Sequence, residues 1–520
     1  MKARSVATDN PVVETTYGPV RGSDDGRVKM WKGIRYAAAP LGALRFRAPE
    51  PPERWAEPAD AIEHGPVCPQ PGLAGIPVDL GAPEHEDCLW LNVWASSDTG
   101  AGDARPVMVW LHGGAYVFGS GSQPIYDGTV LASPGDVVVV TLNYRLGAFG
   151  FLDLSAYNSS SHPFDSNIGL RDALAALRWV RDNIASFGGD PDRVTLFGES
   201  AGAGMVTTLL TTPAAAGLFA GAIAQSSPAT SVYDSGRAHR VAEAVLRKLN
   251  VVAADAHRLR DLPGEVLVAA SKEVFDEVPV DAPGTLAFAP IVDRDLVPDY
   301  PVKMAREGRS HAVPLIIGTN KDEAALFRFM KSPLVPMTRK ALEAMFAEIA
   351  AEQPGLQLPT EAQIGSAYSG LGGKARGMGV ARDVGFRMPA VWFAEGHRAV
   401  APVYLYRFDW TTPMLRLLRI GAAHATELPY VWGNLVQGPA DITFRLGGLD
   451  AGNAVSQRIQ TRWANFAAQS EPTGPRGTPK WTSYHESDRA CLIIDKQDSV
   501  IHDVDLPLRE AWGSEVLYFQ

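Results

Sequence analysis

The 520-residue sequence lacks the features that mark several large classes of protein. Its formal net charge is −10 and its Lys and Arg residues form no cluster, so it offers no basic surface for a phosphate backbone. No apolar run approaches the ~20 residues of a membrane-spanning helix, and no apolar stretch follows Lys2 and Arg4 as a secretory signal requires. We therefore expect a cytoplasmic monomer without nucleic-acid or membrane partners, or a secreted protein if the natural N-terminus has been trimmed.

Cysteine is also scarce, with three residues in the chain. Cys68 and Cys88 flank a Pro- and Gly-rich stretch of a length that a disulfide could close, whereas Cys491 lies in a strand-like apolar run. In a cytosolic protein the ordinary state is three free thiols. The sequence has no His, Cys and Asp spacing typical of a metal site and no phosphate-binding loop followed by Lys, so we expect neither a metal nor a cofactor.

No linker rich in Pro, Ser or Gly and no long block of charge divides the chain. Because large α/β sheets accept long insertions, we expect residues 1–512 to form a single catalytic domain with cap-like insertions. Residues 513–520, Gly-Ser-Glu-Val-Leu-Tyr-Phe-Gln, are similar to a remnant of an engineered protease-cleavage tag, so the fold prediction excludes them.

The hydrophobic periodicity predicts alternating strands and helices. Nearly continuous apolar runs such as 107–111 and 137–141 are typical of strands covered on both faces, and the helical spacing of apolar residues marks 167–184 as an amphipathic helix. The predicted strands are 15–21, 28–36, 90–94, 107–111, 137–141, 193–197, 222–224, 314–318 and 403–408, and a second helix is predicted at 201–210. This alternation predicts an α/β fold with a large, mostly parallel sheet and helices on both faces.

Ser200 is the candidate nucleophile. It lies in Gly198-Glu-Ser-Ala-Gly202, the only GxSxG pattern in the chain, between a predicted strand and a predicted helix. The two glycines allow the sharp turn of a nucleophile elbow, which holds the serine hydroxyl above the end of the sheet. The pattern alone is weak evidence, but its strand–turn–helix setting favours a serine hydrolase.

A serine nucleophile needs a base, an acid that orients the base, and donors for the oxyanion. Among the histidines after Ser200, His424 is the best candidate because it lies in a Gly- and Ala-rich segment after the strand 403–408. The acid is expected at Asp322 or Glu323, which follow the strand 314–318. The backbone N–H groups of Gly114, Ala115 and Ala201 are the expected oxyanion hole.

These motifs, with several others in the expected order along nearly the whole chain, are similar to those of the type-B carboxylesterases, the family that includes cholinesterases and bacterial para-nitrobenzyl esterases. The further similar stretches are Lys32-Gly-Ile-Arg-Tyr-Ala37, Glu86-Asp-Cys-Leu-Trp-Leu-Asn-Val93, Asn143-Tyr-Arg-Leu-Gly147, Gln225-Ser226, Asn320-Lys-Asp-Glu323 and Gly421-Ala-Ala-His-Ala-Thr-Glu-Leu-Pro-Tyr430.

The resemblance implies an α/β-hydrolase fold and assigns Ser200 as nucleophile, Glu323 as triad acid and His424 as base. It implies the same oxyanion hole, a structural role for Glu427, and a disulfide between Cys68 and Cys88. The stretch between these cysteines contains no Trp, whereas cholinesterases carry there the indole that binds the choline ammonium.

We therefore predict a serine carboxylesterase that forms an acyl-enzyme and acts on broad or xenobiotic-type small-molecule esters rather than choline esters. Carbamates, amides and bulky polymer esters remain alternatives, because the same triad could cleave them. A non-catalytic binding module on this fold is disfavoured by the complete triad. Leu286 and Phe288 are candidates for the acyl side of the pocket, and Phe327 and Met414 for the alcohol side, with core packing as the competing role.

Overall fold

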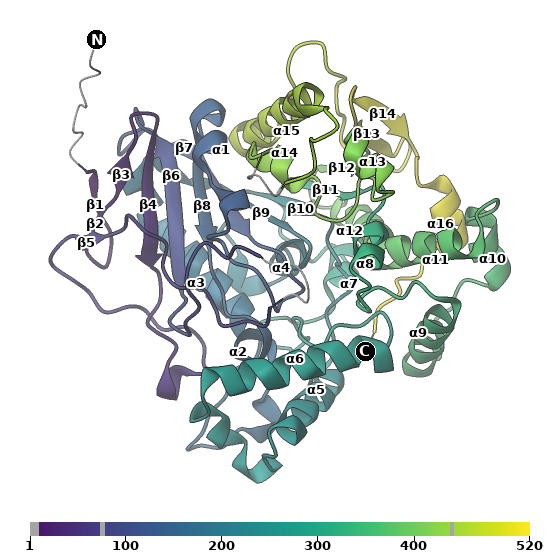
Figure 1. Ribbon diagram of the computed structural model, residues 1–520, viewed down its shortest axis with the longest axis horizontal. Helices are drawn as coiled ribbons and strands as arrows, with labels where there is room; N and C mark the ends of the chain where they lie inside the picture. Colours follow the sequence, from purple (N-terminus) through teal and green to yellow (C-terminus); the bar gives the residue numbers. More distant parts are fainter. Residues whose placement is uncertain (1–9, 73–77, 437–440, 520) are drawn as a thin grey trace.

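A computed structural model describes residues 10–72, 78–436 and 441–519, and its central feature is an 11-stranded sheet (Figure 1). The strand order is β14-β13-β12-β11-β10-β9-β7-β8-β6-β4-β3, and the seven strands from β13 to β8 in this order run parallel to one another. The strands of this sheet are β3 (Ser23–Asp24), β4 (Val28–Arg35), β6 (Trp90–Ser96), β7 (Arg105–Leu111), β8 (Val138–Leu142), β9 (Gly189–Glu199), β10 (Gly221–Gln225), β11 (Leu315–Asn320), β12 (Val403–Phe408), β13 (Ala490–Ile494) and β14 (Ser499–His502). The predicted α/β-hydrolase fold with a mostly parallel sheet is confirmed.

The apolar runs form central strands because both faces of the sheet are buried. In β7, Val107, Val109 and Leu111 pack into one hydrophobic cluster, while Met108 and Trp110 pack into a second cluster on the opposite face. Successive side chains of a strand point to opposite faces, so an unbroken apolar run supplies two cores at once.

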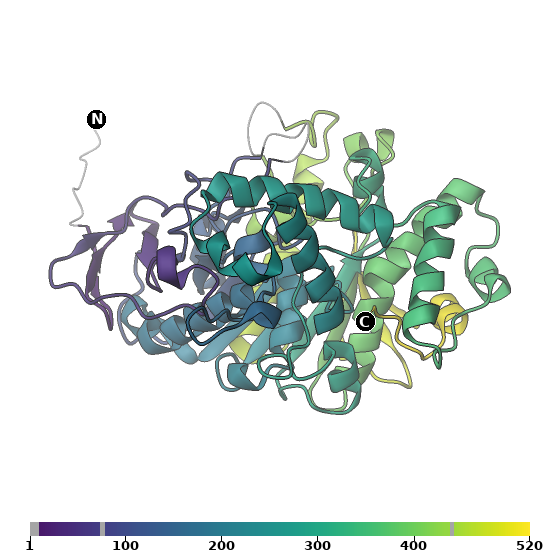
Figure 2. The same cartoon turned by 90° about the horizontal axis from the view of Figure 1, so that it is seen from below.

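Helices cover both faces of the sheet (Figures 1 and 2). The second cluster contains residues of α1, α14 and α15, whereas α2 through α6 and α12 contribute to the first. The helices are α1 (Thr129–Gly135), α2 (Gly147–Phe151), α3 (Ile168–Asn183), α4 (Ala201–Leu209), α5 (Ser235–Lys248), α6 (Gly264–Asp281), α7 (Pro301–Arg306), α8 (Ala324–Phe329), α9 (Arg339–Glu352), α10 (Glu361–Ala367), α11 (Gly373–Arg382), α12 (Met388–His397), α13 (Pro413–Leu417), α14 (Leu428–Trp432), α15 (Leu449–Gln469) and α16 (Leu506–Trp512).

The predicted first strand, 15–21, is only partly a strand. The chain forms β1 (Val12–Glu14) and β2 (Pro19–Arg21), which pair with β5 (Ala59–Asp60) in a separate three-stranded sheet. Thr15 and Gly18 exchange backbone hydrogen bonds in the turn between them, with Gly18 at a φ of 150°. This turn interrupts the alternating pattern that suggested one strand.

Residues 516–519, which belong to the segment excluded from the fold prediction, pack against the body, whereas residues 513–515 are exposed. Val516, Leu517 and Phe519 are buried, and the Tyr518 ring lies 4.4 Å from the Tyr300 ring, centroid to centroid. Figure 1 places this end of the chain beside α6 and α9. The tag origin of the segment and the single domain 1–512 stay predictions.

The expected disulfide between Cys68 and Cys88 is not supported, because all three cysteines are free and buried thiols. The two side chains are neighbours: a hydrogen bond with Cys68, together with burial, raises the pKa of the Cys88 thiol well above its usual value. Leu146 N–H also donates to Cys68 Sγ at 3.2 Å. The two cysteines are thus neighbours in space, but the disulfide that the resemblance implied is absent.

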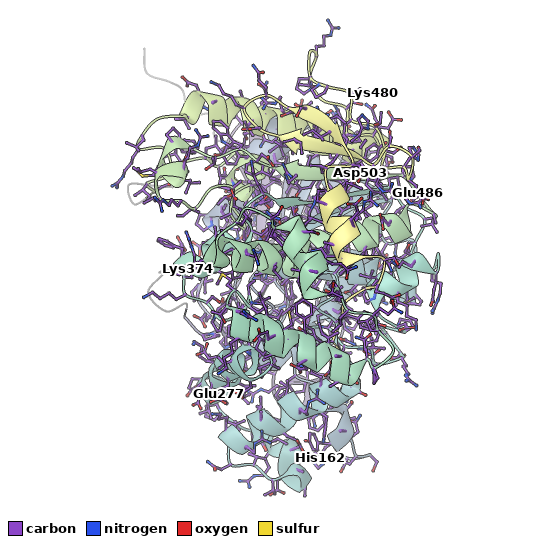
Figure 3. All side chains as sticks on the ribbon, turned by 90° about the vertical axis from the view of Figure 1, so that its right-hand side faces the viewer. His162, Glu277, Lys374, Lys480, Glu486 and Asp503 are labelled. Carbon is purple, nitrogen blue, oxygen red and sulfur yellow. The ribbon has the colours of Figure 1, made fainter. Side chains whose placement is uncertain are left out.

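On the face shown in Figure 3, charged side chains of both signs are spread over the surface, as the labelled Lys374, Lys480 and Glu486 illustrate. Across the described parts of the chain, none of the helices combines the length and the apolar character needed to cross a bilayer.

Candidate active site

Ser200 occupies a strained turn between β9 and α4. Its φ of 55° and ψ of −123° place it outside the regions that residues with a side chain normally adopt. The turn is held by hydrogen bonds from Ser200 N–H to Gln225 O and from Gly204 N–H to Ser200 O. A Cβ atom at Gly202 would lie 2.0 Å from Leu111 O, so glycine is required where the elbow crosses the end of β7.

The structure brings the three predicted triad residues together. His424 Nε2 lies 2.8 Å from Ser200 Oγ, and His424 Nδ1 lies 2.6 Å from Glu323 Oε2. Ser200 follows β9 and Glu323 follows β11, while His424 comes from the loop after β12, so the three meet at the carboxyl end of the parallel strands. This is the geometry in which imidazole can take the serine proton while a carboxylate orients it.

Glu323 is held by a side chain after β10 and by a backbone N–H at the end of its own strand, β11. Its Oε1 accepts hydrogen bonds from Ser226 Oγ at 2.6 Å and from Asn320 N–H at 2.7 Å. The alternative acid, Asp322, instead accepts from Ala422 N–H at 3.1 Å and so fastens the loop that carries the histidine. The sequence placed Ser226 only in a stretch that resembles the family and did not identify it as a partner of Glu323.

Two of the three proposed oxyanion donors, Ala115 and Ala201, border the same pocket as the serine, and Gly114 directly precedes Ala115. Gly114 has a φ of 117°, and a Cβ there would lie 2.1 Å from Phe118 O, so the loop after β7 needs glycine at this position. Ala115 and Ala201 line the pocket beside Ser200. Within residues 10–72, 78–436 and 441–519, no acceptor takes the N–H groups of Gly114, Ala115 or Ala201, which leaves them available to a ligand.

His112, next to this loop, supports it rather than taking part in proton transfer. Its ring stacks on Tyr144 with centroids 4.4 Å apart, and its Nδ1 lies 2.9 Å from Gly113 O. Burial lowers the pKa of His112 to about 4, so the ring is neutral near pH 7.

A second buried carboxyl group, which sequence reasoning missed, lies beside the imidazole. Glu199 Oε1 is 3.2 Å from His424 Nε2 and forms no hydrogen bond with any residue that the structure describes. Burial raises the pKa of Glu199 to about 8. Burial acts in the opposite direction on His424, but the Glu199 and Glu323 carboxylates outweigh it and raise the pKa of His424 to about 9.

Glu427 completes the buried acidic cluster in the structural position that the resemblance implied. It accepts hydrogen bonds from the side-chain amides of Gln225, at 3.2 Å, and Asn320. Burial is the first cause of its raised pKa, and the Glu323 carboxylate adds to it. These amides tie the base of the His424 loop to the ends of β10 and β11.

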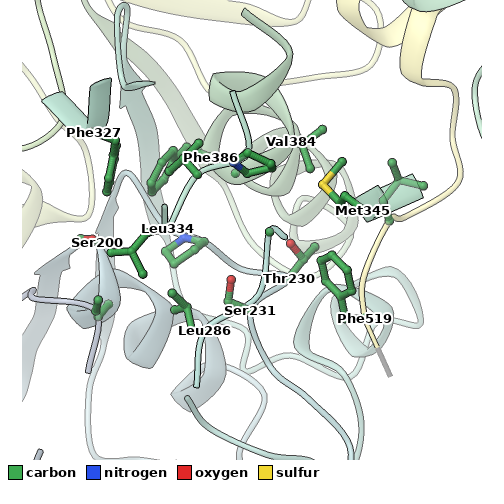
Figure 4. Close-up of a pocket in the computed structure, with 18 of the residues that line it drawn as sticks. Ser200, Thr230, Ser231, Leu286, Phe327, Leu334, Met345, Val384, Phe386 and Phe519 are labelled. Atoms are coloured by element: carbon green, nitrogen blue, oxygen red, sulfur yellow. The ribbon is translucent and has the colours of Figure 1, made fainter. Parts of the chain in front are cut away.

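An apolar pocket of about 800 Å³, counted with the solvent at its mouth, opens beside Ser200. Figure 4 shows its lining extending from Ser200, past Leu286 and Phe386, to Phe519. The lining residues are Ala115, Ser200, Ala201, Pro228, Thr230, Ser231, Gly284, Leu286, Phe327, Leu334, Val335, Pro336, Met345, Ile349, Val384, Gly385, Phe386, Leu517 and Phe519. None of them carries a formal charge.

Two of the four predicted pocket residues, Leu286 and Phe327, belong to this lining. Phe288 does not, because it is fully buried in the core. Met414 does not either: it is half-buried on α13, outside the set that borders the pocket. Among the described residues no group of His, Cys, Asp and Glu is arranged to hold a metal ion.

The chain matches known proteins over nearly its whole length. The profile of the carboxylesterase family matches residues 9–508. The para-nitrobenzyl esterase of Bacillus subtilis (strain 168) is 39% identical over 508 residues, which cover 96% of this chain and 98% of that protein. The pyrethroid hydrolase Ces2e of Rattus norvegicus is 32% identical over 94% of this chain and 87% of its own length.

Solved structures agree with the sequence relatives. The structure of a thermophilic para-nitrobenzyl esterase has a TM-score of 0.84 and 37% sequence identity, covering 97% of this chain and 100% of that chain. Identity above 30% over such coverage, together with the full-length profile match, places the chain in this group. The chain therefore belongs to the carboxylesterase family and is a carboxylic ester hydrolase.

Proposed function

We propose that this carboxylesterase cleaves small, uncharged, apolar esters through an acyl-enzyme formed on Ser200. The observation that carries the proposal is the continuous hydrogen-bonded path from Ser200 Oγ through His424 to Glu323 at the end of an apolar pocket. Free N–H groups border the same point, where the carbonyl oxygen of a bound ester would gain negative charge.

In the first half-reaction His424 Nε2 takes the proton of the Ser200 hydroxyl as its oxygen attacks the ester carbonyl carbon. Gly114, Ala115 and Ala201 donate hydrogen bonds to the oxyanion. The C–O bond to the alcohol then breaks, and His424 gives the proton to the departing alkoxide. In the second half-reaction water replaces the alcohol, and the acid leaves with Ser200 restored.

The composition of the pocket supports the substrate class. Because its lining carries no charged side chain, a charged acyl or alcohol group would lose its hydration without gaining a partner there. The rat relative named as a pyrethroid hydrolase supports apolar xenobiotic-type esters as substrates. A metal or cofactor has no part in this proposed mechanism.

The test is a panel of para-nitrophenyl esters, aryl carbamates and anilides, assayed with the wild type, Ser200→Ala and Ser227→Ala. Ser227 is a matched control because it is also a buried serine near a strand end, but it donates to Ala203 O. We expect ester turnover to fall by about 10⁵-fold or more in Ser200→Ala and to persist in Ser227→Ala. Absence of ester turnover in the wild type, or its persistence in Ser200→Ala, would refute the proposal.

We also propose that the protein acts as a monomer in the cytoplasm, with no nucleic-acid or membrane partner. The net charge of −10 supports the absence of nucleic-acid binding. Light scattering of the purified protein and fractionation of the source cells test these statements; a stable dimer or a secreted protein would overturn them.

A further inference from the structure

The apolar pocket beside Ser200 also contains hydroxyl groups that the mechanism does not use. Among the described residues that line it, three carry a side-chain hydroxyl: Ser200 itself, and Thr230 and Ser231 in the loop after β10. In Figure 4 the last two follow Leu286 along the lining, as seen from Ser200. The rest of the lining is apolar. A polar group in such a lining marks a point where the pocket can distinguish polar from apolar parts of a ligand.

The loop that carries Thr230 is anchored to the catalytic triad. Four residues before Thr230, the Ser226 hydroxyl donates to Glu323 Oε1 at 2.6 Å. Three residues after it, Tyr233 N–H donates to Pro290 O at 3.2 Å. Because both flanks are fixed, the loop holds Thr230 at a defined position relative to the triad.

Thr230 lies at the centre of a tight turn within this loop. Ser231 N–H donates to Pro228 O at 2.8 Å and closes the turn around Ala229 and Thr230. The whole loop lies within residues 9–508, the stretch that the family profile matches. A side chain presented by such a turn is already ordered before a ligand binds, so little conformational freedom is lost on binding.

The two hydroxyls of the turn differ in whether a protein group already uses them. Burial raises the pKa of Tyr233, and hydrogen bonds with the Leu286 backbone and the Ser231 hydroxyl lower it in part. The Ser231 hydroxyl is therefore occupied by the phenol, which also accepts from Leu286 N–H at 2.8 Å. The half-buried Thr230 hydroxyl has no hydrogen bond with any residue that the structure describes. Its proton is thus available to a ligand in the pocket.

We propose that the Thr230 hydroxyl determines specificity by donating a hydrogen bond to an ether or carbonyl oxygen in the acyl chain of the ester. The inference rests on the proposed function, which places the ester carbonyl at Ser200, and on the predicted position of Leu286 on the acyl side. The substrate class is an uncharged ester whose acyl chain carries one acceptor oxygen beyond the point where the chain passes Leu286.

The physical reason is the cost of covering a polar group without giving it a partner. A methylene chain that lies against Thr230 removes water from the hydroxyl and offers no acceptor, whereas an oxygen at that position replaces the water. One hydrogen bond between uncharged groups corresponds to about threefold to tenfold in kcat/KM. An oxygen elsewhere in the chain loses its hydration against the apolar lining and gains no donor.

The experiment replaces one methylene at a time with oxygen in the acyl chain of para-nitrophenyl nonanoate, from the third to the eighth position. The wild type is compared with Thr230→Val, which keeps the shape and loses the hydroxyl, and with Thr230→Ser, which keeps the hydroxyl. Ser231→Ala is the matched control, because it removes the neighbouring hydroxyl that Tyr233 already occupies. Each kcat/KM is divided by the wild-type value for the same ester, so the intrinsic reactivity of the ester cancels. Thermal unfolding shows whether each variant is folded at the assay temperature.

We expect Thr230→Val to lower kcat/KM about threefold to tenfold for esters whose oxygen reaches Thr230, and by less than about twofold for the nonanoate. Thr230→Ser should stay within about twofold of the wild type for every ester. Ser231→Ala should change all esters by the same factor. A loss in Thr230→Val that is equal for all esters, the absence of a loss at every oxygen position, or the same position-dependent loss in Ser231→Ala would overturn the inference.

A binding measurement separates this inference from the proposed function. Displacement of N-phenyl-1-naphthylamine by 2-undecanone, and by the same ketone with single methylenes replaced by oxygen, reports the preference without requiring catalysis. We expect one oxygen-containing ketone to bind about threefold to tenfold more weakly to Thr230→Val, while 2-undecanone binds both proteins alike. If the wild type cleaves no ester but this loss is found, the proposed function fails and the role of Thr230 stands. Unchanged relative affinities refute the role of Thr230.

Discussion

Replacing Glu199 with Gln keeps the shape of the side chain beside Ser200 and removes the carboxylate that most strongly raises the pKa of His424. At an effective dielectric constant of about 20, two unit charges 3.2 Å apart interact by about 5 kcal/mol. This is an upper limit, because the pKa of Glu199 is itself raised to about 8 and the group holds its proton through much of the acid and neutral range.

The direction of the effect follows from the charge. A negative neighbour favours the imidazolium, so its loss lowers the pKa of His424 and makes the free base available at lower pH. One pKa unit corresponds to 1.36 kcal/mol, so even a quarter of that limit moves the acidic limb of the kcat/KM profile downward by about one pH unit. The plateau rate should fall, because Glu199 also stabilises the imidazolium formed in the transition state.

The assay is kcat/KM for para-nitrophenyl acetate from about pH 5 to about pH 9, recorded where the two forms of para-nitrophenol absorb equally. Glu427→Gln is the control. Among the charges that raise the pKa of His424, the Glu427 carboxylate contributes least, so the acidic limb of the kcat/KM profile should shift less in this variant than in Glu199→Gln. A limb that stays in place or moves to higher pH in Glu199→Gln would refute the reasoning.

Three further predictions concern stability and covalent state. Gly202→Ala should lower the free energy of unfolding by at least about 2 kcal/mol and abolish most turnover, because the new Cβ would clash with Leu111 O. Urea unfolding measures the first effect, and a variant with wild-type stability and activity would contradict the prediction. Asp172→Asn should lower the free energy of unfolding, measured in urea, by about 3–5 kcal/mol, since it leaves the buried Arg145 without its carboxylate partner. Asp60→Asn, in an exposed ion pair, should lower it by less than about 1 kcal/mol. Equal losses in the two variants would contradict the prediction. In denaturant without reductant, thiol titration should find all three cysteines free, and a mass increase of about 2 Da on reduction would show the disulfide instead.

The strands and the nucleophile could be predicted because their signals are local. An unbroken apolar run such as 107–111 can be satisfied only between two cores, and the GxSxG pattern places its serine between adjacent elements. The oxyanion loop could be predicted for a similar reason, because Gly114, which adopts a positive φ, lies within a few residues of the end of β7. The assignment of acid and base relied on the family resemblance, as spacing alone left Asp322 open.

The walls of the pocket could not be predicted in the same way. They come from insertions with no periodic relation to the sheet, including α9 and the C-terminal segment, and their side chains meet only in the folded chain. Phe288 shows the difficulty: it is two residues from Leu286 in an irregular segment, yet one side chain borders the pocket and the other is fully buried. Without a strand or helix period, nothing in the sequence specifies which residue points where.

The two buried carboxyl groups that flank the imidazole of His424 differ in their hydrogen-bond donors. Glu323 accepts from Ser226, from a backbone N–H and from His424, and hydrogen bonds of this kind stabilise a carboxylate. Glu199 Oε1 accepts no hydrogen bond from the described residues, so burial dominates and raises the pKa of Glu199 to about 8. Glu199 and Glu323 thus lie on the Nε2 and Nδ1 sides of the imidazole, and within the described residues only Glu323 is also held by other hydrogen-bond donors. His424 Nε2 lies 2.8 Å from the Ser200 hydroxyl, and a negative charge on Glu199 beside it raises the pKa of the imidazole, so Glu199 helps to set the pH at which His424 can act as a base.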